Sequence, residues 1–351
     1  MKPPMRARGS TGAVPGMTRR HFLQAATAAV AAAWAPLPFA RAADEVAGPA
    51  GGGRKRVLRL AHLTDVHVQP ERGAADGLAA CLRHAQGLKD PPALILNGGD
   101  AVMDVLAAGA DRAKVQADLW RRVWKAECSL PVEHCIGNHD VWGWGNKGRP
   151  GTGTTGDEPN WGKQWALDLY GLARRYRSFD RAGWHFVVLD SVYPDPDGKN
   201  AKYTGKLDDE QFDWLERDLA AVPAGTPVLV LSHIPILSAA ALMDEGRVRD
   251  GDWVLPGADM HVDAKRLKGL FRRRPAVKVC LSGHLHLAER LDYNGVAYVC
   301  NGAVCGNWWK GTYQETPAGY GVIDLYADGT VDVQYVDYGW KPAPMGNGLK
   351  A

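Results

Sequence analysis

Five short apolar runs in this sequence each end in a turn that carries aspartate, asparagine or histidine. The clearest case is the run 132–136, which is followed by Gly137-Asn138-His139-Asp140. The other four turns are Asp65-Val66-His67, Gly99-Asp100, Ser232-His233-Ile234-Pro235 and Gly283-His284-Leu285-His286. Short apolar runs bounded by glycine are typical of buried strands, and ligands usually bind at strand ends in open α/β sheets. The pattern therefore predicts one polar site assembled from several strand ends.

The segments between these turns alternate between strand-like and helix-like patterns. Strands are expected at 57–63, 93–96, 132–136, 176–179, 184–189, 228–231 and 277–281. Helices are expected at 74–88, 111–127 and 207–221. Two hairpins close the chain, with Asn294-Gly295 and Asp328-Gly329 as their turns. This alternation predicts parallel β-α-β units, in which each strand delivers its polar turn to the same edge of a sheet.

The polar residues of these turns form a donor set for metals. They are Asp65, His67, Asp100, Asn138, His139, His233, His284 and His286. Two carboxylates, one amide and five imidazoles, with no thiolate among them, suit Zn, Fe, Mn or Co. The set is large enough for two ions with four protein ligands each if one carboxylate bridges. Two metals about 3.5–4 Å apart can hold a hydroxide between them and grip a phosphoryl group for in-line attack.

In order and local spacing, the five turns resemble the signature of the calcineurin-like metallophosphoesterase superfamily. The resemblance covers roughly residues 57–301, and the stretches 207–216 and 303–309 are also similar to bacterial members. It implies an α/β fold, a four-layer α/β/β/α sandwich with two mixed sheets. The ligand sets that it implies are Asp65, His67, Asp100 and His286 for one metal, and Asp100, Asn138, His233 and His284 for the other. Asp100 would bridge the two ions.

The resemblance also implies an enzyme that hydrolyses small-molecule phosphomonoesters or phosphodiesters by attack of the bridging hydroxide. His139 would be the general acid, and Asp140 would orient and charge-stabilise its imidazole. Cyclic-nucleotide and phospholipid phosphodiesterases share the signature, so they stay open as alternatives. A purple acid phosphatase would need a tyrosine soon after Asp100, where this chain has Ala101-Val102-Met103-Asp104. A rival of another class is a metal-binding protein that has lost catalysis, although every ligand and His139 are present.

The N-terminal segment has the pattern of a twin-arginine export signal. Arg19-Arg20 precede an alanine-rich apolar stretch, and Ala40-Arg41-Ala42 matches the A-x-A cleavage pattern. We therefore expect residues 1–42 to be a signal peptide, with Met17 as a possible true start, and residues 43–56 to be a flexible linker. The protein would meet the twin-arginine export machinery and act in the periplasm or elsewhere outside the cytoplasm. An uncleaved membrane anchor is the alternative, and no stable membrane span is expected in the mature form.

Removal of the signal reverses the formal charge of the chain. The whole sequence holds 42 Lys+Arg and 39 Asp+Glu, a formal +3. Residues 1–42 contain six basic and no acidic residues, so the remainder has 36 basic and 39 acidic residues, a formal −3. The basic balance belongs to the signal, and no nucleic-acid partner is expected.

The catalytic domain is expected at 57–340 and a C-terminal tail at 341–351. Two segments without a clear strand pattern, 142–165 and 238–261, are expected to be active-site loops. The first contains a formal G-x-G-x-x-G, but no strand precedes it and no helix opens after it, so a mobile loop is the better interpretation. Four tryptophans in glycine-rich settings are candidates for substrate-binding walls, with an ordinary core role as the alternative. They are Trp142, Trp144, Trp308 and Trp309.

The remaining cysteines and histidines receive plainer interpretations. The six cysteines are expected to be mostly unpaired and buried, with Cys300 or Cys305 the better placed to form a disulfide after export. Four of the six histidines outside the polar turns are expected to be surface or satisfied core residues. They are His62, His84, His134 and His185.

Overall fold

The computed structural model describes residues 53–151, 153–198, 202–243 and 247–342. These residues belong to one compact unit that begins at residue 40. The predicted signal peptide, most of the predicted linker and nearly all of the predicted tail lie outside the described residues.

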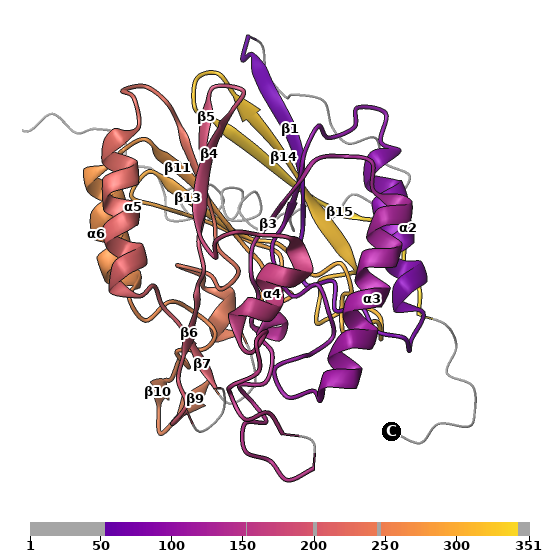
Figure 1. Cartoon of the computed structure of the whole chain (residues 1–351). Helices are drawn as coiled ribbons and strands as arrows, with labels where there is room; N and C mark the ends of the chain where they lie inside the picture. The colour runs from indigo at the N-terminus through magenta and orange to yellow at the C-terminus, as the bar shows by residue number, and fades with distance from the viewer. Residues whose placement is uncertain (1–52, 152, 199–201, 244–246, 343–351) are drawn as a thin grey trace, which may run out of the picture. The chain divides into compact units, whose positions relative to one another are not determined.

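Two mixed β-sheets form the centre of the fold (Figure 1). The five-stranded sheet has the order β15-β14-β1-β2-β3, from Val331–Asp337, Gly319–Tyr326, Arg56–Leu63, Ile95–Asn97 and Val132–His134. The six-stranded sheet has the order β12-β13-β11-β8-β5-β4, from Glu289–Tyr293, Val296–Cys300, Val277–Ser282, Val228–Leu231, Trp184–Val188 and Arg177–Arg181. Strands β1, β2 and β3 run parallel to one another, and so do β5, β8, β11 and β13. The predicted parallel units are therefore present in both sheets.

Three hydrophobic layers separate the sheets and the helices. Helices α2 (Ala74–Gln86) and α3 (Ala110–Glu127) pack on the outer face of the five-stranded sheet, and α5 (Asp209–Ala221) and α6 (Ala264–Arg273) pack on the six-stranded sheet. Side chains of both sheets fill the layer between them. On β8, Leu229 and Leu231 point into this inner layer, while alternate residues point towards the helices. This arrangement confirms the four-layer α/β/β/α sandwich (Figure 1).

Several short elements were not expected from the sequence. They are α4 (Lys163–Tyr170), α6, the strand pairs β6 (Val192–Pro194) with β7 (Tyr203–Gly205) and β9 (Val248–Arg249) with β10 (Asp252–Trp253), and the 3₁₀ turns η1 (Asn138–Asp140) and η2 (Ala240–Leu242). Elements of two to eight residues carry too few apolar positions to produce a clear period. Helix α6 was missed although Leu267, Leu270 and Phe271 have helical spacing, because basic residues fill the rest of its face.

Among the residues that the structure describes, no helix has the length and apolar character needed to span a membrane.

A buried ion pair joins the first strand to the other end of the chain. Arg59 on β1 donates from Nε and Nη2 to the two carboxylate oxygens of Asp324 on β14, at 2.7 and 2.6 Å, and both side chains are more than nine-tenths buried. We expect Asp324→Ala to lower the unfolding free energy by up to about 3–5 kcal/mol, because it leaves the buried Arg59 charge with only the exposed carboxylate of Asp90, 3.2 Å from Nη1. Denaturant unfolding measures the change.

An exposed pair of similar geometry provides the control. Arg290 donates to both oxygens of Asp292 on β12, but these side chains are 40% and 63% exposed. Asp292→Ala should cost about 1 kcal/mol or less. Equal losses in the two variants would show that burial of the Arg59 pair contributes nothing.

His185 on β5 predicts a pH dependence of stability. Its Nε2 and Nδ1 lie 3.0 and 2.7 Å from carboxylate oxygens of Asp218 and Asp180, and the hydrogen bond to Asp218, then that to Asp180, raises the pKa of His185. A raised pKa means that folding favours the protonated ring. Its stabilisation is complete below the ordinary histidine pKa and is lost as pH rises through the higher folded-state pKa. Unfolding free energies at several pH values should therefore show the advantage of wild type over His185→Gln shrinking as the pH rises above the ordinary histidine pKa.

His84 supplies a control of opposite sign. It lies on α2 with Nδ1 2.9 Å from the Tyr320 hydroxyl, and burial lowers its pKa. Wild type should therefore lose stability relative to His84→Gln as the pH falls through the ordinary histidine pKa. A gap between wild type and His185→Gln that does not change with pH would contradict the charged-ring interpretation.

Candidate metal centre

The seven predicted ligands come from the carboxyl ends of strands in both sheets. Asp65 and His67 follow β1, Asp100 follows β2, and Asn138 lies in η1 after β3. The six-stranded sheet contributes the other three, His233 after β8 and His284 and His286 after β11. Parallel neighbours end at the same edge of a sheet, so both sheets direct their polar turns to one place.

Left-handed backbone turns aim most of these side chains. The φ angles are positive at Asp65, His67, Asp100, His284 and His286, between 48° and 72°. This conformation is uncommon for residues other than glycine, although aspartate and histidine adopt it more readily than most, and each instance costs roughly 1–2 kcal/mol. Five of the seven predicted ligands have this strained conformation. Such clusters of strained residues are typical of functional sites, where surrounding contacts maintain the strain.

Two glycines of the sequence motifs leave room for the carboxylates. An added Cβ at Gly137 would lie 2.1 Å from Oδ1 of Asp100, and one at Gly283 would lie 2.2 Å from Oδ2 of Asp65. Both distances are far below contact. Glycine therefore precedes Asn138 and His284 because the neighbouring turns approach too closely for any side chain.

The first cluster has the hydrogen-bond pattern of a cation site. Nε2 of His67 and Nε2 of His286 lie 3.1 Å apart, while their Nδ1 atoms face the carbonyl oxygens of Met103 at 3.2 Å and Gly306 at 2.7 Å. A carbonyl only accepts, so each Nδ1 carries the hydrogen and each Nε2 presents a lone pair to the other. Oδ1 of Asp65 lies 3.6 Å from Nε2 of His286 and is buried without a hydrogen-bond donor. A cation between these atoms would be a partner for Nε2 of His67, Nε2 of His286 and Oδ1 of Asp65.

The second cluster repeats this pattern around His233. Nδ1 of His233 faces the Gly98 carbonyl at 2.8 Å, which leaves Nε2 directed at Oδ1 of Asn138, 3.0 Å away, and at Oδ2 of Asp100, 3.2 Å away. His284 completes the group, and its donor atom lies within 4.8 Å of those of Asp100 and His233. The same Asp100 Oδ2 lies 3.7 Å from Nε2 of His67 in the first cluster. One carboxylate oxygen thus faces both clusters, as the predicted bridge requires.

Two of the four histidine ligands are neutral without metal, and the other two favour a proton that a metal ion would displace. Burial lowers the pKa of His67 and of His284 to about 3, so both imidazoles are neutral at ordinary pH. Burial opposes protonation of His233 and His286, but the Asp100 charge raises the pKa of His233 to about 9, and the neighbouring Cys305 and Asp65 raise that of His286. Burial opposes ionisation of Asp65 and Asp100, but the neighbouring histidines, chiefly His286 and His233, outweigh it and lower the pKa of both carboxyls. Neutral imidazole and ionised carboxylate are the forms that bind metals.

His139 lies at the open edge of the first cluster. Its ring is 4.7 Å from that of His67, its side chain is 27% exposed, and its backbone N–H donates to Oδ1 of Asp100 at 2.8 Å. Nδ1 lies 3.5 Å from Oδ1 of Asp104. Burial opposes protonation, but Asp100 and Asp104 outweigh it and raise the pKa of His139, which favours the form that can donate a proton.

The structure corrects the predicted role of Asp140. Its carboxylate accepts hydrogen bonds from the backbone N–H groups of Asp100, Ala101 and Gly137 and from the Tyr170 hydroxyl, so it faces away from the His139 ring. Burial, reinforced by the Asp100 charge, raises the pKa of Asp140 to about 6. The carboxylate beside His139 is Asp104, which the sequence analysis did not select. Its position four residues after Asp100 in the adjacent turn was the available signal.

The four tryptophans divide into core and rim. Trp142 and Trp309 are 5% and 1% exposed, and their indole N–H groups donate to the carbonyls of Ala108 and His67. This placement corrects the expectation of a substrate-binding wall for these two. Trp144 is half-buried beside Trp161 and the ammonium group of Lys163. Trp308 is half-buried at the metal centre, with its ring 4.4 Å from that of His286.

The base of the segment 142–165 is firmly attached, which differs from the expected mobile loop. Trp142 and Gly162 form a β-bridge, and Asn146, only 1% exposed, donates to the carbonyls of Ala107 and Ala108. Thr154 is 4% exposed and donates to the Gly143 carbonyl. Helix α4 then begins at Lys163. The glycines that suggested mobility instead permit tight turns over these buried polar groups.

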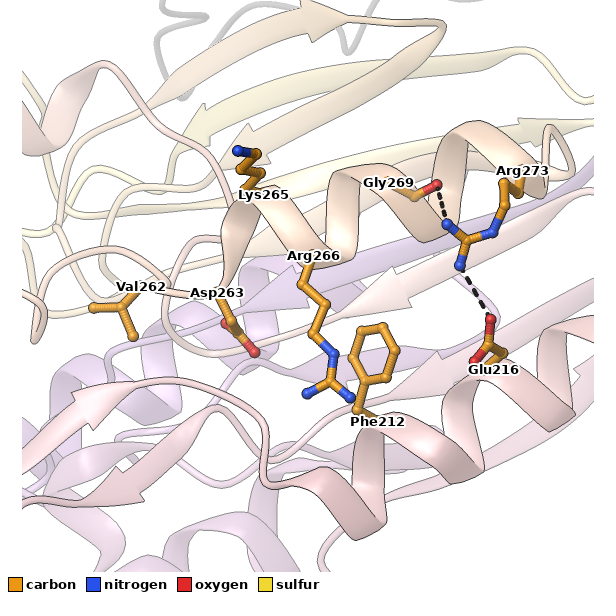
Figure 2. Close-up of a pocket in the computed structure, with 8 residues that line it drawn as sticks. All are labelled: Phe212, Glu216, Val262, Asp263, Lys265, Arg266, Gly269 and Arg273. Atoms are coloured by element: carbon orange, nitrogen blue, oxygen red, sulfur yellow. Dashed lines mark hydrogen bonds and ion pairs between the residues drawn. The ribbon is translucent and has the colours of Figure 1, made fainter.

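One cysteine borders the first cluster, whereas the described pocket lies away from it. Sγ of Cys305 lies within 4.8 Å of donor atoms of His67 and His286, and burial raises the pKa of its thiol. All six cysteines are free and five are buried, as expected for most of them, and neither Cys300 nor Cys305 forms a disulfide. Figure 2 shows a shallow pocket between α5 and α6, where Arg266 lies over the Phe212 ring and Arg273 donates to Glu216. None of the predicted metal ligands lines this pocket, so it has no part in the centre.

The chain is similar to several known proteins. A family model described as calcineurin-like phosphoesterase matches residues 58–288. A 3′,5′-cyclic-nucleotide phosphodiesterase of Nostoc is 28% identical over 165 residues, 46% of this chain and 54% of that protein. A 3′,5′-cyclic adenosine monophosphate phosphodiesterase of Escherichia coli is 28% identical over 174 residues, 48% of this chain and 56% of that protein. The chain thus spans about half the length of these two relatives.

Two further matches are longer but weaker. A Rhodococcus erythropolis protein named "probable cyclic nucleotide phosphodiesterase" is 25% identical over 260 residues, 70% of each chain. The crystal structure of a dimetal phosphatase from Danio rerio aligns with 81% of this chain and all of that one, at 16% identity and a TM-score of 0.49.

Proposed function

Because the chain belongs to the calcineurin-like phosphoesterase family, we propose that it is a dinuclear-metal phosphoesterase. One observation carries this proposal. Oδ2 of Asp100 faces both clusters, and in each cluster imidazole lone pairs point at other acceptors. Positive charge between these groups removes the conflict, either as a metal ion or as a proton on Nε2 of His233 and of His286. Transition-metal ions are the metal cations that this donor set suits.

The roles of the protein's own residues follow from their positions. Asp65, His67, Asp100 and His286 would hold one ion, and Asp100, Asn138, His233 and His284 the other. When bound, two such ions supply an activated water and stabilise charge on a phosphoryl group. His139 donates the proton that the leaving oxygen needs, and the Asp104 carboxylate, 3.5 Å from Nδ1 of His139, favours the protonated ring. Mn, Fe, Zn and Co are all candidates for the ions.

Among substrates, we propose phosphodiesters, and cyclic nucleotides as the first class to test. The names of the curated relatives support this choice. The position of Trp308 also supports this choice of substrate. The Trp308 ring lies beside His286 at the metal centre, and its centroid is 5.6 Å from that of the Tyr313 ring. A flat ring at the rim of a phosphate site can stack on a nucleobase beyond the phosphate. Phospholipid diesters and phosphomonoesters are the competing classes.

Replacement of Trp308 tests this choice of substrate. We expect Trp308→Ala to raise KM for 3′,5′-cyclic AMP by roughly 5- to 100-fold, the loss of one base-stacking contact, while Trp308→Phe loses much less. Steady-state kinetics with cyclic AMP and with a glycerol phosphodiester, which has no flat group, separates stacking from damage to the centre. An equal rise in KM for both substrates would contradict base stacking.

The decisive experiment is hydrolysis after metal reconstitution. Metal-free protein would be loaded with Mn, Fe, Zn or Co and tested on p-nitrophenyl phosphate, bis-p-nitrophenyl phosphate, cyclic AMP and a phospholipid. His286→Ala reveals contaminating hydrolases, and His84→Gln, which lies on α2, controls for substitution as such. Metal-dependent turnover of diesters above monoesters supports the proposal. No turnover with any metal would favour the metal-binding protein without catalysis.

We also propose that the enzyme is exported and acts in the periplasm. The paired Arg19-Arg20 and the A-x-A pattern at Ala40-Arg41-Ala42 support this. Replacing both arginines with lysine should leave the protein in the cytoplasmic fraction. Undiminished export of that variant would exclude the twin-arginine route.

A further inference from the structure

Helix α4 is attached at both ends to the strand ends that form the metal centre. At its C-terminal end, the Tyr170 hydroxyl donates to Oδ2 of Asp140 at 2.7 Å, just after β3 of the five-stranded sheet. At its N-terminal end, the Lys163 ammonium group pairs with Asp190, a fully buried carboxylate just after β5 of the six-stranded sheet. Helix α4 therefore connects the two sheets whose strand ends supply the ligands (Figure 1).

Asp140 links this helix to the backbone of the bridging residue. Its Oδ2 accepts from the N–H groups of Asp100, at 2.9 Å, and Gly137, at 3.0 Å, and its Oδ1 accepts from that of Ala101, at 3.0 Å. Asp140 is 0% exposed. In the described part of the chain, Tyr170 provides the side-chain donor to this carboxylate, and the other three donors are backbone groups.

Aromatic packing holds the Tyr170 ring in place. It stacks on His134 with the centroids 4.5 Å apart and the planes at 11°, and the edge of Trp120 on α3 lies 6.2 Å away. His134 pairs in register with Asn97 across β3 and β2, and its Nδ1 lies 3.1 Å from the amide nitrogen of Asn97. The hydroxyl is thus fixed relative to the end of β2, where Asp100 follows.

We propose that Tyr170 is a positioning residue for the metal centre, which holds Asp140 and through it the Asp100 and Gly137 turns so that the Asp100 carboxylate faces both ligand clusters. In this role, α4 is a strap that keeps the ligands of one sheet in register with those of the other. The inference rests on the proposed dinuclear function. It explains why Asp140 and Tyr170 are placed beside the centre without facing its donor atoms.

Tyr170→Phe is the direct test, because it keeps the stacked ring and removes only the hydroxyl. Metal-free protein would be titrated with Zn²⁺ and with Mn²⁺ in competition with a chelating dye. We expect the dissociation constant to rise about 10- to 100-fold, the usual effect of losing a group that orients a metal ligand. Native-state hydrogen exchange should become faster at the amides of Asp100, Ala101 and Gly137. The unfolding temperature of the metal-free protein is measured in parallel.

Tyr176→Phe is the matched control. The Tyr176 hydroxyl also donates to a carboxylate, that of Glu210 at 3.0 Å, but on the surface and away from the centre. Tyr176→Phe should change metal affinity less than about 2-fold, since the Tyr176 hydroxyl orients no metal ligand. If Tyr170→Phe does not fold, Lys163→Met loosens the other end of α4 and should weaken metal binding by up to about 10-fold.

Three results would overturn the inference. Unchanged metal affinity in Tyr170→Phe, or in Lys163→Met if that variant carries the test, would show that the strap does not act on the ligands. A lower unfolding temperature of the metal-free protein with unchanged affinity would make Tyr170 a purely structural residue. Wild-type protein that binds neither metal would remove the inference together with the proposed function, whereas the first two results leave that function standing.

Discussion

Asp100→Asn is expected to remove both metal ions and to reduce phosphoesterase activity by at least about 10³-fold, because the ions supply both the nucleophile and most of the charge stabilisation. Oδ1 of Asp100 accepts from the His139 N–H at 2.8 Å, and an asparagine oxygen can keep that bond. The amide NH₂ then replaces Oδ2, the atom that faces His233 and His67. An NH₂ group donates hydrogens and binds no cation, so both clusters lose their shared ligand. Elemental analysis of purified protein measures the loss.

Asp65→Asn is the matched comparison for this prediction. Asp65 approaches His286 and His67 but belongs only to the first predicted ligand set. The variant Asp65→Asn should lose most of one ion and retain much of the other, whereas Asp100→Asn should lose both. Full metal content in Asp100→Asn would remove the bridge, and loss of both ions in Asp65→Asn would show that the two clusters do not fill independently.

His139→Ala is expected to keep its metals and to lower kcat by about 10²–10⁴-fold, the usual range for general acid–base catalysis. The His139 ring lies beside the ligand His67, and one of its nitrogens lies within 4.8 Å of a carboxylate oxygen of Asp100, but His139 belongs to neither predicted ligand set, so the metals should stay bound without it. The loss should be smallest for p-nitrophenyl esters, whose leaving group needs little protonation, and largest for alkyl esters. Rates for a series of leaving groups, with metal content measured on the same samples, check both parts.

Asp104→Asn extends this prediction to the partner of His139. Asp104 lies 3.5 Å from Nδ1 of His139 and is itself 36% exposed, so its loss should lower kcat less than loss of the ring. Asp104→Asn should also shift the alkaline limb of the pH–rate profile to lower pH, because His139 must be protonated to act as the acid and Asp104 helps to raise its pKa. Equal losses for good and poor leaving groups in His139→Ala would exclude this residue as the acid.

The strand ends and the parallel β-α-β units followed from local pattern, whereas the four-layer sandwich was implied by the family resemblance. Runs such as 228–231 and 277–281 are apolar at every position, and in the structure both faces of β8 and β11 are buried, one against the other sheet and one against helices. The turns after these strands contained the ligands because the carboxyl ends of parallel strands share an edge. The metal-ligand assignments stay predictions, but the structure brings all seven side chains together as the spacing implied.

Side-chain direction and the pairing of distant segments came only with the tertiary structure. The sequence pattern favoured Asp140 as the partner of His139, yet the 3₁₀ turn at Asn138–Asp140 points Asp140 at the backbone of the turn that follows β2 and leaves Asp104 beside the ring. Trp308 and Trp309 are adjacent in sequence with φ angles of 46° and 67°, and one reaches the metal centre while the other packs on Gly77 in the core.

Tyr170 and Lys163 gave no sequence signal for their contacts, because their partners lie 30 and 27 residues away and in different sheets. The hydrophobic period of a strand or helix depends on neighbours a few residues apart, so it identifies the elements and the chemistry at their ends. The contacts that orient a catalytic histidine or brace a bridging carboxylate depend on how those elements pack. That packing is decided by the whole core rather than by any one segment.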